Sequence, residues 1–148
     1  MTMPDSLEKL QYLCNIIPTL LEQIPDEAFC FKSSPTKWSK KEILGHLIDS
    51  ATNNHQRFIR LQYENEPVIS YDQNHWNELS NYNSLNIKHL IDFWAIYNRH
   101  LIELIKNIPE QNLGKLGTGT DGQKFPLYFY INDYVDHLEH HIKQLVIY

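Results

Sequence analysis

The sequence predicts an all-α fold, a four-helix bundle. Four long segments repeat apolar residues at helical spacing, at about residues 6–23, 39–64, 86–107 and 127–146. The stretches between them are polar, and no segment has the clear alternating pattern of a strand. A chain of 148 residues has the usual length of one domain and can bury a sizeable core. We therefore expect a single domain, residues 1–148, in which four helices pack around one core.

The first predicted helix, residues 6–23, contains a proline. Its apolar stripe consists of Leu7, Leu10, Leu13, Cys14, Ile17 and Leu21. Pro18 lies inside the segment and has no N–H group to donate to the carbonyl of Cys14. Its ring also crowds the preceding turn, so we expect the helix to be kinked at this point.

The second predicted helix begins with the clearest start signal in the chain. Ser39 and Glu42 are spaced as a capping box, in which Ser39 is the N-cap and the Glu42 side chain reaches back to it. The apolar residues that follow at helical spacing are Ile43, Leu44, Leu47, Ile48, Ala51, Phe58 and Ile59. This helix should end near Glu64, before Pro67.

The third and fourth predicted helices also carry one apolar stripe each. That of the third consists of Leu90, Ile91, Trp94, Tyr97, Leu101, Leu104 and Ile105. That of the fourth consists of Leu127, Ile131, Tyr134, Leu138, Ile142 and Leu145. The long 67–85 connection before the third helix holds Tyr71, Asp72, His75 and Trp76. Its length and aromatic content favour a cover over a site, with ordinary loop packing as the alternative.

A glycine-rich loop at residues 117–122 matches the pattern G-x-G-x-x-G. A dinucleotide-binding loop needs a strand directly before this pattern and a helix directly after it. Here a helix and a loop precede the glycines, and Lys124, Phe125 and Pro126 separate them from the next helix. We therefore expect a turn or a small hairpin rather than a nucleotide site.

The composition excludes several functional classes. The formal net charge of −5 argues against binding nucleic acid through a basic face. The sequence has no signal-peptide pattern, and no apolar run approaches the roughly 20 residues of a membrane span, so we expect a cytoplasmic protein. Cys14 and Cys30 are too few for a zinc ribbon or a disulfide framework. Both lie among apolar neighbours, and we expect them to be reduced and packed.

Eight histidines stand out against the two cysteines, and three of them lie in the fourth helix. At 100° per residue, His141 lies about 40° from His137 on the inner flank of this helix. His140 falls about 60° to the other side, toward solvent. Two histidines at positions i and i+4 can bind one metal ion, as in the H-E-x-x-H motif, although the glutamate of that motif is absent here.

The second helix offers a third histidine. His46 begins a polar strip beside the apolar stripe, and this strip also contains Ser50, Asn53 and Arg57. Helical geometry alone leaves two interpretations open, a metal ligand or a solvated helix face. The remaining histidines are expected to have structural roles. His89 and His100 lack a partner at ligand spacing, and His55 lies on the far side of the apolar stripe. His75 lies in the 67–85 connection, where approach to a site is the alternative.

Two segments resemble the signatures of a known family. Residues 37–50, Lys-Trp-Ser-Lys-Lys-Glu-Ile-Leu-Gly-His-Leu-Ile-Asp-Ser, resemble the helix 2 signature of the DinB/YfiT-like superfamily. Residues 134–145, Tyr-Val-Asp-His-Leu-Glu-His-His-Ile-Lys-Gln-Leu, resemble its helix 4 signature. The resemblance covers nearly the whole chain and implies an up-down-down-up bundle. It also implies a divalent metal ion, zinc or nickel, bound by His46, His137 and His141.

The resemblance also implies a class of reaction. The family includes thiol S-transferases that use low-molecular-weight thiols such as bacillithiol, and the mycothiol-dependent maleylpyruvate isomerase. We expect a metal-dependent S-transferase acting on a small molecule; the alternatives are a metal-dependent hydrolase and a non-enzymatic binding bundle. The family also makes a homodimer plausible. The residues that we expect around the site are Asp49, Asn53, Arg57, Tyr71, Asp72 and Tyr134. A solvated helix face is the alternative for the first three.

Overall fold

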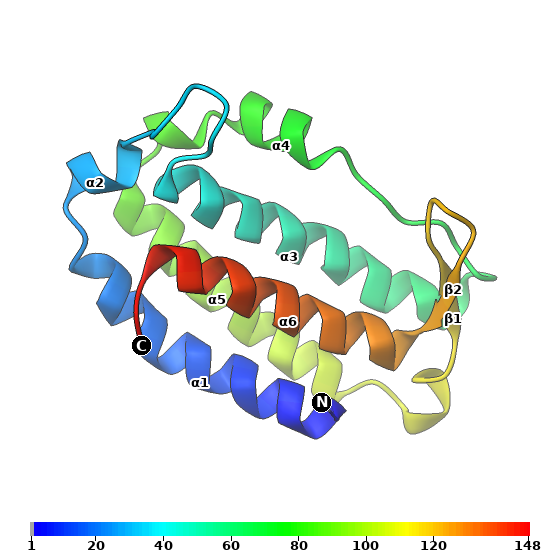
Figure 1. The fold of residues 1–148 in the computed structure, drawn as a ribbon. Coiled ribbons are helices and arrows are strands. Elements are labelled where there is room, and N and C mark those ends of the chain that lie inside the picture. The colour runs from blue at the N-terminus through cyan, green and yellow to red at the C-terminus, as the bar shows by residue number, and fades with distance from the viewer. Residues whose placement is uncertain (1) are drawn as a thin grey trace.

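The computed structural model describes residues 2–148 and contains the four long helices that the sequence predicts. They are α1 (Met3–Glu22), α3 (Lys40–Tyr63), α5 (Ile87–Lys106) and α6 (Leu127–Leu145). Figure 1 shows that α1 and α6 run in one direction while α3 and α5 run in the other. This is the expected up-down-down-up order, and the all-α bundle is confirmed.

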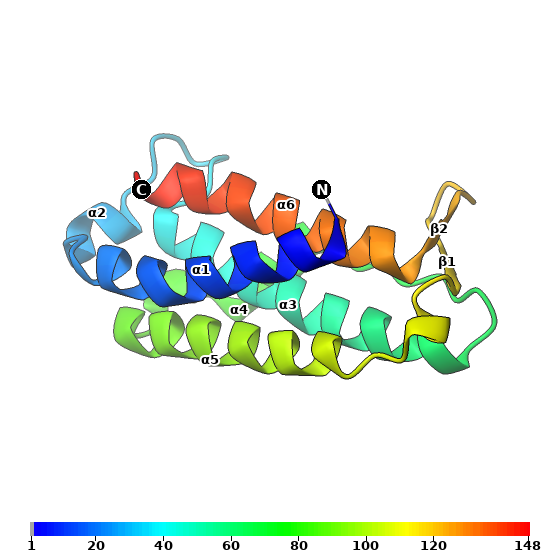
Figure 2. The same cartoon turned by 90° about the horizontal axis from the view of Figure 1, so that it is seen from below.

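Each long helix packs against two others around one core. Both α1 and α3 contact α5 and α6, which closes the ring of four helices seen from two directions in Figures 1 and 2. The largest fully buried side chains are Trp94, Phe29 and Phe58, surrounded by aliphatic residues. Burying one such aliphatic side chain contributes about 1.5–3 kcal/mol, so this core accounts for most of the stability of the bundle.

Helix α1 begins earlier than the periodicity predicts and accommodates its proline. It starts at Met3 because Thr2 and Asp5 form a capping box, a signal that lies before the apolar stripe. Pro18 lies inside the continuous helix, and the carbonyl of Cys14, which lacks its usual partner, accepts a hydrogen bond of 3.1 Å from the Arg99 guanidinium of α5. The hydrogen bond lost to the proline is thus replaced by a contact between two helices.

Helix α3 begins as the capping box predicts. The Ser39 hydroxyl accepts from the Glu42 backbone N–H, and the Glu42 carboxylate accepts from the Ser39 N–H. One assignment to the apolar stripe was wrong, because Ile59 is 39% exposed. At 100° per residue, Ile59 lies farther from the centre of the stripe than Phe58, which is fully buried.

The long connection between α3 and α5 follows from the topology. These helices are parallel, so the chain must return along the bundle, as Figure 1 shows. On the way it forms a helix that the periodicity does not predict, α4 (Gln73–Ser80), and a short 3-10 turn, η1 (Tyr82–Ser84). The Asp72 carboxylate caps α4 by accepting from the His75 backbone N–H. Eight residues are too few for a clear periodic signal.

The remaining elements are short. The helix α2 (Asp26–Cys30) follows α1, and the turn η2 (Glu110–Asn112) follows α5. The glycine-rich loop joins β1 (Leu116–Thr118) to β2 (Lys124–Pro126) as an antiparallel hairpin, which confirms the predicted small hairpin. Within residues 2–148, no helix has the length and apolar character needed to cross a membrane.

Candidate metal centre

Three histidines from two helices meet at one point between α3 and α6. The Nε2 atom of His137 lies 3.4 Å from Nε2 of His46 and 3.2 Å from Nε2 of His141. One ring nitrogen from each residue lies within 4.8 Å of the other two. His137 and His141 are one helical turn apart on α6, and His46 faces them from the second turn of α3.

The spacing of these nitrogens fits a single divalent metal ion. Zinc–imidazole bonds are about 2.0–2.1 Å long, so two tetrahedral ligands have nitrogens roughly 3.3–3.4 Å apart. The Nδ1 atom of His141 lies 3.0 Å from Oε1 of Gln144. In the tautomer with the proton on Nδ1, this N–H donates a hydrogen bond to the amide oxygen and leaves Nε2 free to bind a metal. The triad is therefore compatible with a divalent metal, with at least one coordination position open to other ligands.

His46 is more deeply buried than a polar strip on a helix suggests. It is 1% exposed because α6 and the segment before α3 cover this face of α3. The Trp38 ring lies against it, with ring centroids 4.9 Å apart. Its Nδ1 atom is buried and has no hydrogen-bond partner within residues 2–148. The interpretation as a solvated face is therefore wrong for His46.

The environment keeps His46 and His137 neutral. Burial, followed by the proximity of the other two histidines, lowers the pKa of His46 to about 3. Burial and the neighbouring His141 and His140 lower the pKa of His137 to about 4. A neutral imidazole can donate its lone pair to a metal, whereas a protonated one cannot. His46 and His137 are thus in the binding form at neutral pH.

Acidification should destabilise the metal-free protein through these histidines. In the unfolded chain they titrate near pH 6.5, so between pH 6.5 and about 4 the unfolded state binds more protons than the folded state. The free energy of unfolding that these histidines contribute above pH 6.5 is therefore lost as the pH falls from 6.5 toward about 4. We expect urea unfolding between pH 7 and 5 to show about 1 kcal/mol more loss per pH unit in the wild type than in His46→Ala. Equal pH dependence in the two proteins would contradict this. Asp49, whose pKa burial raises to about 6, acts in the opposite direction in both proteins.

Two cavities adjoin the triad. The first, of about 170 Å³, is lined by His46 and His137 together with Ser50, Asn54, Arg57, Tyr71, Gln73, Asp133 and Tyr134. The second, of about 450 Å³, is lined by His141 together with Thr36, Lys37, Trp38, Ile43, Gln73, Asn74 and Gln144. The three histidines thus lie between two neighbouring spaces that share Gln73, and each space reaches a different part of the triad.

The residues expected around the site divide into two groups. Arg57, Tyr71 and Tyr134 line the first cavity with His46 and His137. Asp49 and Asn53 are buried but do not line it, and Asp72 is an exposed cap of α4. The Asp49 carboxylate instead accepts a short hydrogen bond from the Tyr82 hydroxyl, and the Asn53 amide donates to the Asp49 backbone carbonyl.

Sequence reasoning missed several residues that line the cavities. Asn54 lies eight residues after His46 on α3, so helical spacing could have identified it, and Ser50 was placed in the polar strip but not named as a site residue. Asp133 likewise lies one turn before His137 on α6. Gln73 and Trp38 come from segments outside the four long helices, and no periodic signal places them.

The other histidines and both cysteines lie outside the triad. His55 pairs with the Tyr97 hydroxyl at 2.7 Å, and His75 pairs with Asp72 at 2.7 Å. His140 is exposed, as its angle on the helix predicts, and so are His89 and His100. Cys14 is packed in the core as expected. Cys30 is exposed, so its predicted packing was wrong.

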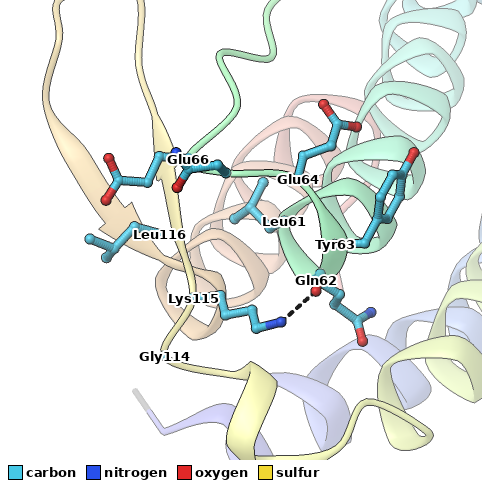
Figure 3. A pocket seen from close by; sticks show the side chains of 9 residues that line it. Leu61, Gln62, Tyr63, Glu64, Glu66, Gly114, Lys115 and Leu116 are labelled. Atoms are coloured by element: carbon cyan, nitrogen blue, oxygen red, sulfur yellow. Dashed lines mark hydrogen bonds between the residues drawn. The ribbon is translucent and has the colours of Figure 1, made fainter.

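Another pocket lies at the opposite end of α3 from the triad. Figure 3 shows it between the last turn of α3 and the segment before β1, lined by residues such as Gln62, Glu64 and Glu66. Lys115 donates to the Gln62 carbonyl across it. About 15 residues of α3 separate His46 from this pocket, which corresponds to roughly 22 Å along the helix axis. None of the three histidines lines it.

Comparison with solved structures shows the same fold in proteins of low sequence identity. YfiT from Bacillus subtilis, described as a probable metal-dependent hydrolase with an unusual four-helix bundle topology, has a TM-score of 0.87 at 20% identity. The alignment covers 97% of this chain and 83% of YfiT. The mycothiol-dependent maleylpyruvate isomerase has a TM-score of 0.78 at 13% identity, covering 98% of this chain and 61% of the isomerase. The present chain therefore spans about three fifths of the isomerase.

Sequence comparison assigns the family. No curated protein matches the chain. The family model of the DinB superfamily matches residues 15–145, a range that runs from the middle of α1 to the end of α6 and includes all three histidines of the triad. The chain therefore belongs to the DinB superfamily.

Proposed function

We propose that this protein is a metal-dependent enzyme that transfers a low-molecular-weight thiol to an electrophilic small molecule. The observation that carries the proposal is the position of the triad between two cavities. His46 and His137 face one cavity, and His141 faces the other. Two spaces beside one reactive point can hold two small molecules close together, which makes the reaction between them effectively unimolecular.

The triad would hold one divalent ion, zinc or nickel, through His46, His137 and His141. Such an ion lowers the pKa of a bound thiol, so that the thiolate is present near neutral pH. The chain's own residues bind the reactants and limit the access of water. Tyr71 and Gln73, from the connection after α3, line the smaller cavity, and Trp38 lines the larger one.

The sulfur of the proposed reaction comes from a small molecule. Cys14 is buried in the core and burial raises the pKa of its thiol to about 11, so its thiolate is scarce at neutral pH. Cys30 is exposed on α2, and its thiol faces the backbone carbonyl of Asn83. In the transfer, the thiolate sulfur forms a bond to carbon, the leaving group departs with its electron pair, and the thiol proton passes to solvent.

Hydrolysis is the second candidate reaction. It is favoured by the likeness to YfiT, which is described as a probable metal-dependent hydrolase. A hydrolase needs a general base beside the reacting water. The buried carboxylate nearest in sequence to His46 is Asp49, which does not line the cavity and accepts a hydrogen bond from Tyr82. Asp133 lines the smaller cavity with His46 and His137, and its carboxylate could act as such a base. The preference for thiol transfer therefore rests on the two cavities beside the triad and not on the lack of a base.

A panel of thiols and electrophiles tests the proposed reaction. Protein loaded with zinc or nickel is incubated with each thiol and with electrophilic alkylating substrates, and conjugates are measured by mass spectrometry. We expect conjugation to require both the metal and a small thiol. The variant Cys14→Ala/Cys30→Ser should keep this activity, since neither side chain lies at the triad. Cleavage of esters or amides without any thiol would support the hydrolase instead. No turnover in either assay would contradict both enzymatic functions and favour a non-enzymatic binding protein.

A further inference from the structure

The smaller cavity contains an arginine that donates no hydrogen bond to a carboxylate of residues 2–148. Arg57 lies on α3, eleven residues after His46, and is half-buried. Its Nη1 donates to Oδ1 of Asn54 at 2.7 Å, and its Nη2 donates to the backbone carbonyl of Ile69 at 2.7 Å. Both acceptors are uncharged. The guanidinium also lies over the Tyr130 ring, 4.9 Å from its centroid.

The guanidinium is held rigidly and still has free donors. An arginine has five N–H groups in a planar fork, and the two hydrogen bonds within residues 2–148 use two of them. Burial lowers the pKa of Arg57, but an arginine remains protonated at any physiological pH. The remaining donors belong to a fixed, partly desolvated cation that lines the same cavity as His46 and His137.

We propose that Arg57 binds the carboxylate of a small organic acid that occupies this cavity, with the other end of the acid at the histidine triad. A planar guanidinium fork matches the two oxygens of a carboxylate, and charge-assisted hydrogen bonds of this kind are stronger than neutral ones. Among the lining residues of the described chain, Arg57 is the one permanent cation. The placement of the acid's reactive end rests on the proposed function, whereas the contact with Arg57 does not.

The dimensions of the cavity select a short acid. The eleven residues from His46 to Arg57 rise about 16 Å along α3. The hydrogen bond from Arg57 to Asn54 brings the guanidinium back toward the triad, which shortens the distance that a ligand must span. A volume of about 170 Å³ holds a small molecule but not a peptide or a nucleotide. Straight-chain acids of about six carbons are suitable probes of this size.

Asp133 sets a limit on the charge of the ligand. Its carboxyl group lines the same cavity, and burial raises its pKa while Arg57 lowers it. Among residues 2–148 it forms no hydrogen bond or ion pair with Arg57, although the two opposite charges attract each other. It therefore leaves the guanidinium donors free but repels an incoming anion. Asp133→Asn should therefore bind an acid more tightly than the wild type.

Binding of hexanoate and of the isosteric neutral hexanamide tests the proposal. The zinc-loaded full chain is titrated with each probe while the ¹H–¹⁵N resonance of the Arg57 Nε–H group is followed by NMR. We expect a saturable shift with hexanoate and none with hexanamide. Arg57→Gln should weaken hexanoate binding by roughly 10- to 100-fold. Arg60→Gln, which removes a cation paired with Glu64 one turn farther along α3, should bind hexanoate as the wild type does.

Several results would overturn the proposal. Equal binding of hexanoate and hexanamide would show that the cavity recognises the apolar chain alone. Unchanged hexanoate affinity in Arg57→Gln, with affinity lost on removal of zinc, would place the carboxylate at the metal. The response of the wild-type Arg57 Nε–H resonance to hexanoate and hexanamide tests the contact even if a variant fails to fold. Because the probes contain no thiol, failure of thiol transfer leaves this result unaffected, and failure here leaves the triad and its reaction untouched.

Discussion

His46→Ala should abolish tight metal binding. Removing one of three imidazoles leaves two ligands from a single helix, and the loss should exceed the 10- to 100-fold decrease seen when only a partner of a metal ligand is removed. When the free metal concentration is 100 times the Kd, metal binding raises the free energy of unfolding by about 2.7 kcal/mol. In a chain of this length that amounts to a rise in Tm of roughly 5–10 °C, which the variant should lack. Metal analysis and thermal unfolding with and without zinc measure both effects.

The matched control is His140→Ala. His140 neighbours His141 on α6 but is exposed, and it is not among the three histidines whose nitrogens converge. This variant should bind one equivalent of metal and keep the increase in Tm. If His46→Ala still binds metal with the affinity of the wild type, the triad is not the metal site and the proposed reaction has no basis. If both variants lose metal equally, the metal is bound by the histidine-rich segment 137–141 in general and not by the convergence of His46, His137 and His141.

Gly45→Ala should destabilise the protein strongly, although alanine is the better helix former. A Cβ at this position would lie 2.1 Å from Cδ2 and 2.3 Å from Cγ of Tyr82. Tyr82 is buried and its hydroxyl is bound to Asp49, so its ring has no free space into which to move. Overpacking of this kind costs about 1–3 kcal/mol, and breaking the buried hydrogen bond costs more. After the gain of up to about 1 kcal/mol in helix propensity, we expect a net loss of roughly 2–4 kcal/mol in chemical unfolding.

Two further variants isolate the cause. Gly114→Ala should be close to neutral, because nothing lies within 4 Å of its added Cβ. In the background of Tyr82→Ala, Gly45→Ala should cost nothing or stabilise slightly, since the ring that it meets is gone. The same loss in both backgrounds would show that the clash with Tyr82 is not the reason. Because Tyr82 belongs to the same connection as Tyr71 and Gln73, which line the cavity beside His46, Gly45→Ala should also weaken metal binding.

Much of the fold could be predicted because the signals are local. The Ser39–Glu42 capping box places the start of α3, and apolar spacing places the four long helices to within about three residues. The short helices α2 and α4 could not be predicted, since five and eight residues carry too little periodicity. The exposure of Cys30 was missed for a related reason. Apolar neighbours in sequence do not establish which side of a short helix faces the core.

The three histidines show where sequence information ends. The spacing of His137 and His141 determined by itself that both lie on one face of α6, because helical geometry fixes the angle between residues four apart. It could not decide whether His46 faces solvent, since the periodicity of one helix describes the face toward its apolar neighbours and not what covers the rest. Only the packing of α6 and the returning connection onto α3 buries that strip. The same packing places Arg57 in a cavity with the triad and turns Asp49 toward Tyr82, because side chains on different helices come together only when the register between those helices is set.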